Sequence, residues 1–371
     1  MTAGRSLRIA LFSPALSAGG AERVLSLLAN ALAAEGHAVT LITLAASDTD
    51  FFPIAPTIRR IGLGAQAISG GPIEALRNNA GRLRQLRSAL RAARPDALIA
   101  FCDQANVLAL AASRGLPCRV IVSERTDPAR HEIGQLWSGL RRLAYPWADV
   151  VVAQTETVAD WIRREIPGTR VAVIPNPVLP PSIAKQPGSP GLTPPTLIGM
   201  GRLSREKGFD RLLEAFAAVS PTFPDWRLHL LGDGPLRETL EIEARRLGIA
   251  DRVNFPGNVA DPAAHLATAD LFVLPSRYEG FPNALLEAMA AGLPVLAFDC
   301  PSGPSAIIRP GVDGMLIPAD DVPALRDNMA RLMADAAERR RLGGAAVGVL
   351  DRFGLPALLR QWVNLMDERA G

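Results

Sequence analysis

The chain is poor in several residue types, and each scarcity argues against a class of protein. Its three cysteines, Cys102, Cys118 and Cys300, are odd in number and far apart, which argues against a disulfide scaffold or a zinc site and favours a reducing compartment. Aromatic residues make up only 5% of the chain, and no nucleic-acid-binding motif accompanies its arginines. We therefore expect no nucleic-acid partner.

Long hydrophobic runs are also missing. No apolar stretch approaches the roughly eighteen residues needed to span a bilayer. Arg5 and Arg8 precede a short apolar run that imitates a signal peptide, but Ser13 and Pro14 end it too early, so we interpret it as a first β-strand. With 371 residues and 48% hydrophobic side chains, the sequence predicts a compact, cytoplasmic protein of two domains.

The small net charge of +3 is unevenly distributed, since residues 1–190 carry +7 and residues 191–371 carry −4. Much of the positive excess lies between Arg77 and Arg94, in a segment with helical spacing. One face of this helix carries Arg84, Arg87, Arg91 and Arg94, and another carries Leu83, Leu86 and Leu90. The pattern predicts peripheral contact with an anionic membrane, at its cytoplasmic face. The alternative is a solvated surface helix whose leucines face the core.

Apolar, β-rich runs alternate with helical patterns along the whole chain, which predicts parallel sheets built from βαβ units. The alternation stops in residues 177–195, which contain seven prolines and read as a linker. We therefore expect an α/β fold with two Rossmann-like domains facing across a cleft, one over residues 1–176 and one over 196–354. The last helix, within 355–371, is expected to cross back to the first domain.

The segment from Leu274 to Pro294 is the most informative one for function. It places Glu279 before, and Glu287 inside, a helix that follows a predicted strand, so both carboxylates should lie at the carboxyl edge of a parallel sheet, where such folds bind ligands. The turn between them should present backbone N–H groups to an anion. It consists of Gly280, Phe281, Pro282, Asn283, Ala284 and Leu285.

Glycine-rich loops follow the first strand of each half. Gly19 and Gly20 open a helix and allow a diphosphate or an acceptor to approach the backbone closely, although such a pair also forms simple turns. In the second half, Gly201 is followed by Arg202 and Lys207, two cations that suit a diphosphate. Lys207 is one of only two lysines in the chain. Its alternative role is a surface ion pair with Glu206.

Three further patterns carry less weight. Gly232, Gly257 and Asn258 end strands, where they would flank a base and a ribose or serve only as turns. The stretch 48–50, Asp-Thr-Asp, has a metal-binding form but lies in a short polar loop, and the stretch 62–67 imitates a dinucleotide fingerprint without the helix that should follow it. We interpret both as loops and expect no metal.

In order along the chain, the motifs GGAERV, IPNPV, GRLSREKGFD, LLGDGP, FPGNV and SRYEGFPNALLEAMAAGLPV resemble those of the family 4 retaining glycosyltransferases, which have the GT-B fold. The resemblance covers nearly the whole chain. Residues 122–128 and 299–304 resemble a bacterial subgroup that extends lipid-diphosphate-linked oligosaccharides from UDP-sugars. That subgroup commonly has glutamate after Gly-Pro-x, where this chain has Ala306.

The resemblance implies a role for each motif. Arg202 and Lys207 would neutralise the donor diphosphate, Glu279 would orient the transferred sugar, and Glu287 would accept hydrogen bonds from the ribose. The remaining glycines and turn residues named above would complete the UDP-sugar site, with no cofactor. The acceptor side would include Glu22, Ser123, Glu124 and Arg125. Two other functions stay open, a UDP-sugar epimerase of the same architecture and a non-catalytic nucleotide-sugar-binding subunit.

Overall fold

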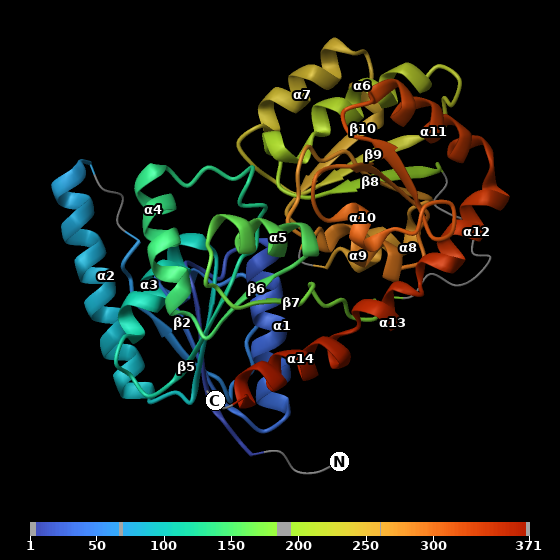
Figure 1. Cartoon of the computed structure of the whole chain (residues 1–371). Helices are drawn as coiled ribbons and strands as arrows, with labels where there is room; N and C mark the ends of the chain where they lie inside the picture. Colours follow the sequence, from blue (N-terminus) through green and yellow to red (C-terminus); the bar gives the residue numbers. More distant parts are fainter. Residues whose placement is uncertain (1–4, 67–69, 184–193, 260, 369–371) are drawn as a thin grey trace. The chain divides into compact units, whose positions relative to one another are not determined.

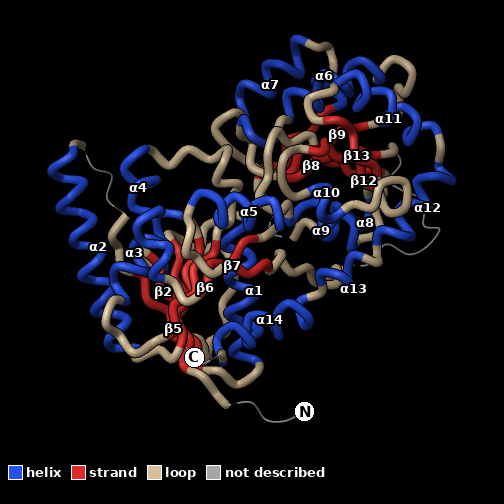
Figure 2. Tube along the Cα trace, in the orientation of Figure 1, coloured by secondary structure: helices blue, strands red, loops and turns tan. Residues whose placement is uncertain are grey.

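The structure of the chain, a computed structural model, describes residues 5–66, 70–183, 194–259 and 261–368. It divides into two compact units, residues 1–176 with 356–371 and residues 177–355. Each unit contains one parallel β-sheet with helices packed on it (Figures 1 and 2). The predicted α/β class with two Rossmann-like domains is therefore confirmed. Residues 184–193 of the predicted linker lie outside the described residues.

The first unit has a seven-stranded sheet in the order β3-β2-β1-β4-β5-β6-β7. All neighbouring strands are parallel, and the central ones are apolar on both faces because helices cover both. The strands are β1 (Arg8–Ser13), β2 (Ala38–Thr43), β3 (Arg59–Gly62), β4 (Ala97–Phe101), β5 (Arg119–Ser123), β6 (Val150–Ala153) and β7 (Val171–Val173). The helices are α1 (Gly20–Ala34), α2 (Pro72–Ala93), α3 (Asp103–Ser113), α4 (Gln135–Ala144) and α5 (Glu156–Glu165).

The predicted basic helix forms as α2, and its leucines belong to the protein core. Leu86 and Leu90 are fully buried, and Leu83 packs against the same cluster. Arg87 donates to the carbonyls of Ala112 (2.7 Å) and Arg114 (2.8 Å), at the end of α3. The leucines of α2 therefore face the core of the unit, as the alternative of a solvated surface helix predicts.

The second unit has a six-stranded parallel sheet in the order β10-β9-β8-β11-β12-β13. Its strands are β8 (Thr196–Met200), β9 (Arg227–Leu231), β10 (Val253–Gly257), β11 (Leu271–Leu274), β12 (Val295–Asp299) and β13 (Met315–Pro318). Its helices are α6 (Phe209–Val219), α7 (Arg237–Arg246), α8 (Ala263–Thr268), α9 (Asn283–Ala290), α10 (Pro304–Ile307), α11 (Val322–Ala334), α12 (Ala336–Ala346) and α13 (Val349–Phe353). One apolar core cluster gathers side chains from β8, β9, β11, α6 and α11.

The last helix, α14 (Leu355–Asp367), contacts the first unit. The ring of Trp362 lies 6.0 Å from the ring of Phe101, at the end of β4. Glu368, just after α14, accepts from Arg119 (3.0 Å) and Arg170 (2.7 Å), beside β5 and β7. Apolar packing and charge therefore both attach α14 to this sheet. Within the described ranges, no helix combines the length and the apolar character needed to cross a membrane.

Candidate active site

The strand order of the second unit brings together two loops that are far apart in sequence. From β8 the chain first proceeds to β9 and β10 on one side and then returns to β11 on the other. In parallel sheets, a crevice forms at the carboxyl edge where the order reverses, since the loops of the two central strands diverge there. The loop after β8 carries Gly201, Arg202 and Lys207, and the loop after β11 carries Glu279.

Lys207 and Glu279 form an ion pair at this point. The Nζ atom of Lys207 donates to Oε1 (2.7 Å) and Oε2 (2.8 Å) of Glu279, and the hydroxyl of Ser276 also donates to Oε1 (2.7 Å). Glu279 is only 7% exposed, and a buried carboxylate is tolerated when its oxygens have such partners. Since an ammonium group has three N–H donors, Lys207 keeps one for a further acceptor.

Gly208 and Arg277 hold the two loops against each other. Gly208 has φ +68°, and a Cβ there would lie 2.0 Å from the carbonyl oxygen of Pro275, in the loop after β11. The Arg277 guanidinium donates to the carbonyl of Arg205 (2.8 Å) and pairs with Asp210 (2.5 Å). The hydrogen bond that Arg277 donates to Asp210 raises the pKa of Arg277. Gly208, Asp210 and Arg277 lie in the sequence motifs GRLSREKGFD and SRYEGFPNALLEAMAAGLPV, but no role was predicted for them.

The other residues predicted for the diphosphate and nucleoside lie at the same edge of the sheet. Arg202 is exposed, and its guanidinium makes no hydrogen bond to a described residue. The backbone N–H of Gly232 donates to the carbonyl of Gly257 (2.8 Å), which joins the ends of β9 and β10, and Asn258 beside them is exposed. The structure thus brings these positions together without assigning them a ligand.

The turn before α9 is more enclosed than the sequence indicated. Gly280 and Phe281 are buried, and the Phe281 ring packs 5.4 Å from the ring of Phe353. The backbone N–H of Leu285 donates to the carbonyl of Pro282 (3.2 Å), so the prediction that it points out of the helix is wrong. The remaining predicted residues of this turn and helix are buried or half-buried, namely Pro282, Asn283, Ala284 and Glu287.

In the first unit, the order of the strands reverses between β1 and β4. Gly19 precedes α1 and Gly20 begins it, so the predicted helix N-terminus lies at this point. A Cβ on Gly19 would lie 2.2 Å from Oε2 of Glu22, which shows that the carboxylate of Glu22 folds back over the start of its own helix. An acidic side chain there complements the positive end of the helix dipole.

Ser123 and Glu124, at the end of β5, are fully buried. The Tyr145 hydroxyl donates to Oε1 of Glu124 at 2.5 Å, and Nη1 of Arg141 lies 3.5 Å from the same oxygen. Oε2 has no hydrogen-bond partner among the described residues. Burial raises the pKa of the Glu124 carboxyl to about 7, although Arg141 and the Tyr145 hydroxyl favour its charged form. These contacts place Glu124 beneath the surface of the sheet edge.

Replacing Glu124 by glutamine is expected to change how stability depends on pH. The wild-type carboxyl has its pKa raised from 4.5 to about 7 on folding, so its contribution is complete below pH 4.5 and is lost as the pH rises through 7. The loss should reach about 3 kcal/mol. Glu124→Gln lacks this titration, so urea unfolding between pH 5 and pH 8 should show the variant gaining stability relative to the wild type.

The matched control is Glu156→Gln, at an exposed carboxylate on α5. Its unfolding free energy should follow that of the wild type within about 0.5 kcal/mol at every pH. A difference between Glu124→Gln and the wild type that stays constant from pH 5 to pH 8 would contradict the raised pKa.

Arg125, the next residue, lies on the opposite side of the chain and is also buried. Its Nη1 donates to the Ser123 hydroxyl (3.2 Å) and its Nη2 to Oδ1 of Asn176 (2.7 Å). The guanidinium carbon lies 4.0 Å from the centre of the Phe101 ring. Of the four residues predicted for the acceptor side, Ser123 and Arg125 are thus hydrogen-bonded to each other, whereas Glu124 contacts Tyr145 and Arg141.

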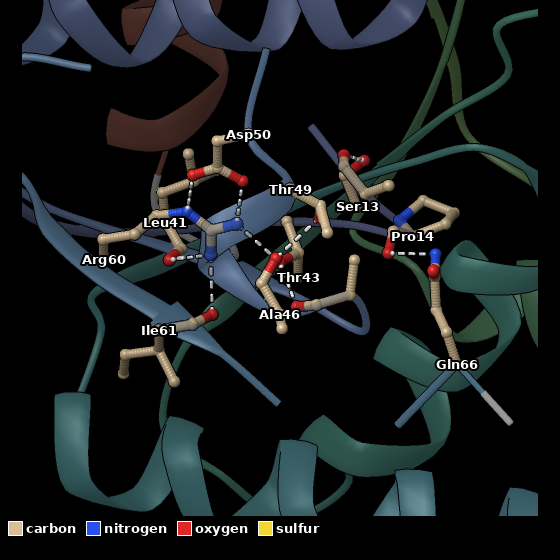
Figure 3. Close-up of polar contacts among 12 residues, drawn as sticks. Ser13, Pro14, Leu41, Thr43, Ala46, Thr49, Asp50, Arg60, Ile61 and Gln66 are labelled. Atoms are coloured by element: carbon tan, nitrogen blue, oxygen red, sulfur yellow. Dashed lines mark hydrogen bonds and ion pairs between the residues drawn. The ribbon is translucent and has the colours of Figure 1, made fainter. Parts of the chain in front are cut away.

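Of the two patterns that were interpreted as loops, the stretch 48–50 lies partly in a short 3-10 helix (Ser47–Thr49), and residue 67 of the other lies outside the described residues. Both carboxylate oxygens of Asp50 accept from Arg60, at 2.6 and 2.7 Å, and the same guanidinium donates to the Thr43 hydroxyl at 2.7 Å (Figure 3). Gly62 ends β3, and residues 63–66 form a loop. Across the described part of the chain, no three His, Cys, Asp or Glu side chains are grouped as a metal site requires.

Two family models match the chain. Residues 18–180 match the model described as Glycosyltransferase Family 4, and residues 183–347 match the model described as Glycosyl transferases group 1. The first match contains the glycine pair of α1 and the Ser123–Arg125 segment. The second contains the Lys207–Glu279 pair, so both sites described above lie within matched residues.

Relatives of known name support the same assignment. The chain is 35% identical over 290 residues to an exopolysaccharide phosphotransferase of Streptomyces coelicolor, a match that covers 76% of this chain and 30% of that protein. It is 27% identical over 98% of its length to an α-1,4-N-acetyl-D-galactosaminyltransferase of Campylobacter jejuni, of which it covers 99%. That enzyme is named for an undecaprenol-diphosphate-linked substrate.

A solved structure shows the same fold. The Anabaena protein HepE, in complex with UDP and glucose, superposes with a TM-score of 0.77 at 21% identity, covering 98% of this chain and all of that one. The two family models together span most of the sequence, and both describe transfer of glycosyl groups. With its two Rossmann-like units, the chain therefore belongs to the glycosyltransferases of the GT-B architecture.

Proposed function

We propose that the chain is a retaining glycosyltransferase of family 4. It would transfer a hexose or N-acetylhexosamine from a UDP-sugar to a lipid-diphosphate-linked oligosaccharide during the synthesis of a bacterial surface polysaccharide. The observation that carries the proposal is the ion pair between the half-buried Lys207 and the buried Glu279, at the point where the strand order reverses in the second unit. The name of the Campylobacter relative and the UDP bound by HepE support the choice of acceptor and donor.

In this proposal the charged groups divide the work of transfer. Lys207 directs its remaining N–H at the donor diphosphate, and the exposed guanidinium of Arg202 binds the same leaving group by two hydrogen bonds. Stabilising the charge that develops on a departing diphosphate supplies the largest part of catalysis. Glu279, held by Lys207 and Ser276, orients the transferred sugar, and Glu287 accepts from the ribose. No side chain is proposed as a covalent nucleophile, and no metal ion is proposed.

The test is a panel of UDP-sugars, each incubated with a lipid-diphosphate-linked sugar in the presence of EDTA. We expect transfer with one donor and NMR of the product to show the anomeric configuration of that donor. Inverted configuration, or activity lost to EDTA and restored by a divalent metal, would overturn the corresponding part of the proposal. Conversion of UDP-N-acetylglucosamine without an acceptor would identify an epimerase instead, and UDP binding without turnover would identify a binding subunit.

We also propose that the first unit contacts an anionic membrane through the starts of α2 and α4. Ile73 (87% exposed) and Leu76 (74%) lie one turn apart on α2, and Leu136 (72%) lies at the start of α4. Both helices follow parallel strands, so both begin at the carboxyl edge of the sheet, and Figure 1 draws their starts at the same end of the unit. The exposed Arg77, one turn further along α2, complements anionic headgroups.

Replacing Ile73, Leu76 and Leu136 by serine is expected to weaken liposome binding by about 100-fold or more, because each apolar side chain contributes roughly 1.5 to 3 kcal/mol on leaving water. Co-sedimentation with vesicles rich in phosphatidylglycerol measures this. Ile242→Ser, at an exposed apolar side chain of α7, is the control and should bind like the wild type. If only replacement of Arg84, Arg87, Arg91 and Arg94 weakens binding, the basic face of α2 makes the contact instead.

A further inference from the structure

Arg125 is a buried cation that forms no ion pair with any residue that the structure describes. Its side chain is 8% exposed, and within the described ranges no carboxylate lies at ion-pair distance from it. The neighbouring carboxylate, Glu124, bonds to Tyr145 and Arg141 instead. Burial lowers the pKa of Arg125 to about 10, while electrostatic interactions with Cys102 and Glu22 act to raise that pKa. Removing a charge from water without an opposite charge in contact is costly, so an anionic ligand beside Arg125 would be stabilising.

The guanidinium is held in one place by neutral groups. It stacks on Phe101, and it donates to Ser123 and Asn176. Oδ1 of Asn176 accepts a second hydrogen bond, from Nε2 of Gln154 at 2.6 Å. These residues end or follow four adjacent strands, β4 to β7, so the cation lies at the carboxyl edge of the sheet, where parallel sheets bind ligands.

Polar atoms at this edge are left without partners. Among the described residues, Arg125 Nε and Gln154 Oε1 are buried and make no hydrogen bond. Two of the five N–H donors of the guanidinium are used by Ser123 and Asn176, so donors remain. The set of groups therefore combines a positively charged donor with a neutral acceptor, which suits a ligand that carries both an oxyanion and hydroxyl groups.

We propose that Arg125 binds the phosphate of a phosphorylated sugar acceptor, with Gln154 accepting from a hydroxyl of the same molecule. The proposal rests on the proposed glycosyl transfer, whose acceptor carries a diphosphate on its sugar. Asn176, Ser123 and Phe101 are positioning residues, since they fix the guanidinium and need not touch the acceptor. An arginine held in this way binds phosphate as a charge-assisted hydrogen-bond donor of fixed direction.

The first test compares two acceptors for Arg125→Gln, the lipid-diphosphate-linked sugar and its uncharged alkyl glycoside. We expect kcat/KM to fall about 100-fold for the diphosphate acceptor, as for loss of a charge-assisted contact, and less than threefold for the glycoside. The KM for the UDP-sugar should not change. Equal losses with both acceptors, in a variant that unfolds like the wild type, would overturn the proposal while leaving glycosyl transfer intact.

A second variant retains Arg125, so it tests the proposal even if Arg125→Gln does not fold. Asn176→Asp gives Arg125 a protein carboxylate at its present hydrogen-bond distance of 2.7 Å. The variant should lose about tenfold or more in kcat/KM for the diphosphate acceptor alone, because the new carboxylate competes with phosphate for the guanidinium. An unchanged preference for the charged acceptor would contradict the proposal.

A binding measurement separates this inference from the proposed function. With UDP saturating the donor site, inorganic diphosphate is titrated into the wild type and into Arg125→Gln by calorimetry. We expect binding by the wild type and a loss of about tenfold or more in the variant. Equal binding by both would overturn the phosphate site. Absence of sugar transfer by the wild type, with the difference in diphosphate binding intact, would overturn the proposed function alone.

Discussion

Replacing Lys207 by methionine is expected to lower kcat/KM for sugar transfer by about 10³-fold. The variant loses the donor that we assign to the departing diphosphate, and loss of one fixed donor to a developing charge commonly costs 10² to 10³ in rate. It also leaves the buried carboxylate of Glu279 with the Ser276 hydroxyl and without a cation. Steady-state transfer from the UDP-sugar that the donor panel identifies measures the effect.

Glu279→Gln, alone and combined with Lys207→Met, tests whether the two residues act as one unit. The glutamine keeps an acceptor for Ser276 but removes the charge that aligns Lys207, and we expect a loss of about 10²-fold or more. If the two residues act as one unit, the double variant should be little worse than Lys207→Met alone. Normal transfer by a folded Glu279→Gln would refute the role assigned to this carboxylate.

The control for removing an ion pair is Arg246→Met on α7. Arg246 pairs with Glu243 at 2.6 Å, but its side chain is exposed, so its loss should leave both transfer and stability nearly unchanged. A loss of activity in this variant that matches Lys207→Met would mean that any reduction of charge in the second unit impairs the protein.

Replacing Gly208 by alanine is expected to lower the free energy of unfolding by about 3 kcal/mol or more, and to reduce transfer with it. Two effects add, because the left-handed φ of +68° costs an L-residue roughly 1 to 2 kcal/mol and the new Cβ would lie 2.0 Å from the carbonyl oxygen of Pro275. Relief of that contact separates the loops that carry Lys207 and Glu279. Urea unfolding and transfer kinetics measure the two losses.

Gly248→Ala separates these effects. Gly248 has φ +70°, and a Cβ there would meet nothing within 4 Å, so the variant carries the same backbone strain without the contact. We expect it to lose about 1 to 2 kcal/mol of stability and to transfer sugar normally. Equal stability and equal activity of the two variants would show that the approach of Gly208 to Pro275 does not position the pair.

The pattern of strands was largely predictable from the sequence because buried parallel strands are nearly continuous apolar runs. The strand β3 has no such run, since its sequence is Arg-Arg-Ile-Gly, and it lies at the edge of its sheet. An edge strand pairs on one side only and needs less apolar surface, so it leaves a weak signal. The backbone N–H of Leu285 was expected to be free but is hydrogen-bonded to Pro282. This bond was not predictable, since it depends on how the chain turns at Pro282.

Glu124 and Arg125 show what adjacency in the sequence does not reveal. Both were assigned to the acceptor side as one segment. Because successive residues of an extended chain point to opposite faces, Glu124 reaches Tyr145 and Arg141 while Arg125 reaches Phe101 and Asn176. Only the tertiary structure shows that the Glu124 carboxylate does not pair with the neighbouring Arg125 guanidinium. The proposed phosphate site is based on this separation.

The sequence by itself determined the two α/β units and the order of the motifs within them, since periodicity and glycine-rich turns are local properties of the chain. It also identified Lys207 and Glu279 as separate candidates. That they form one pair, 72 residues apart, was decided by the strand order, which returns the chain to the other side of β8. Pairing across a sheet depends on topology, and a linear pattern does not contain it.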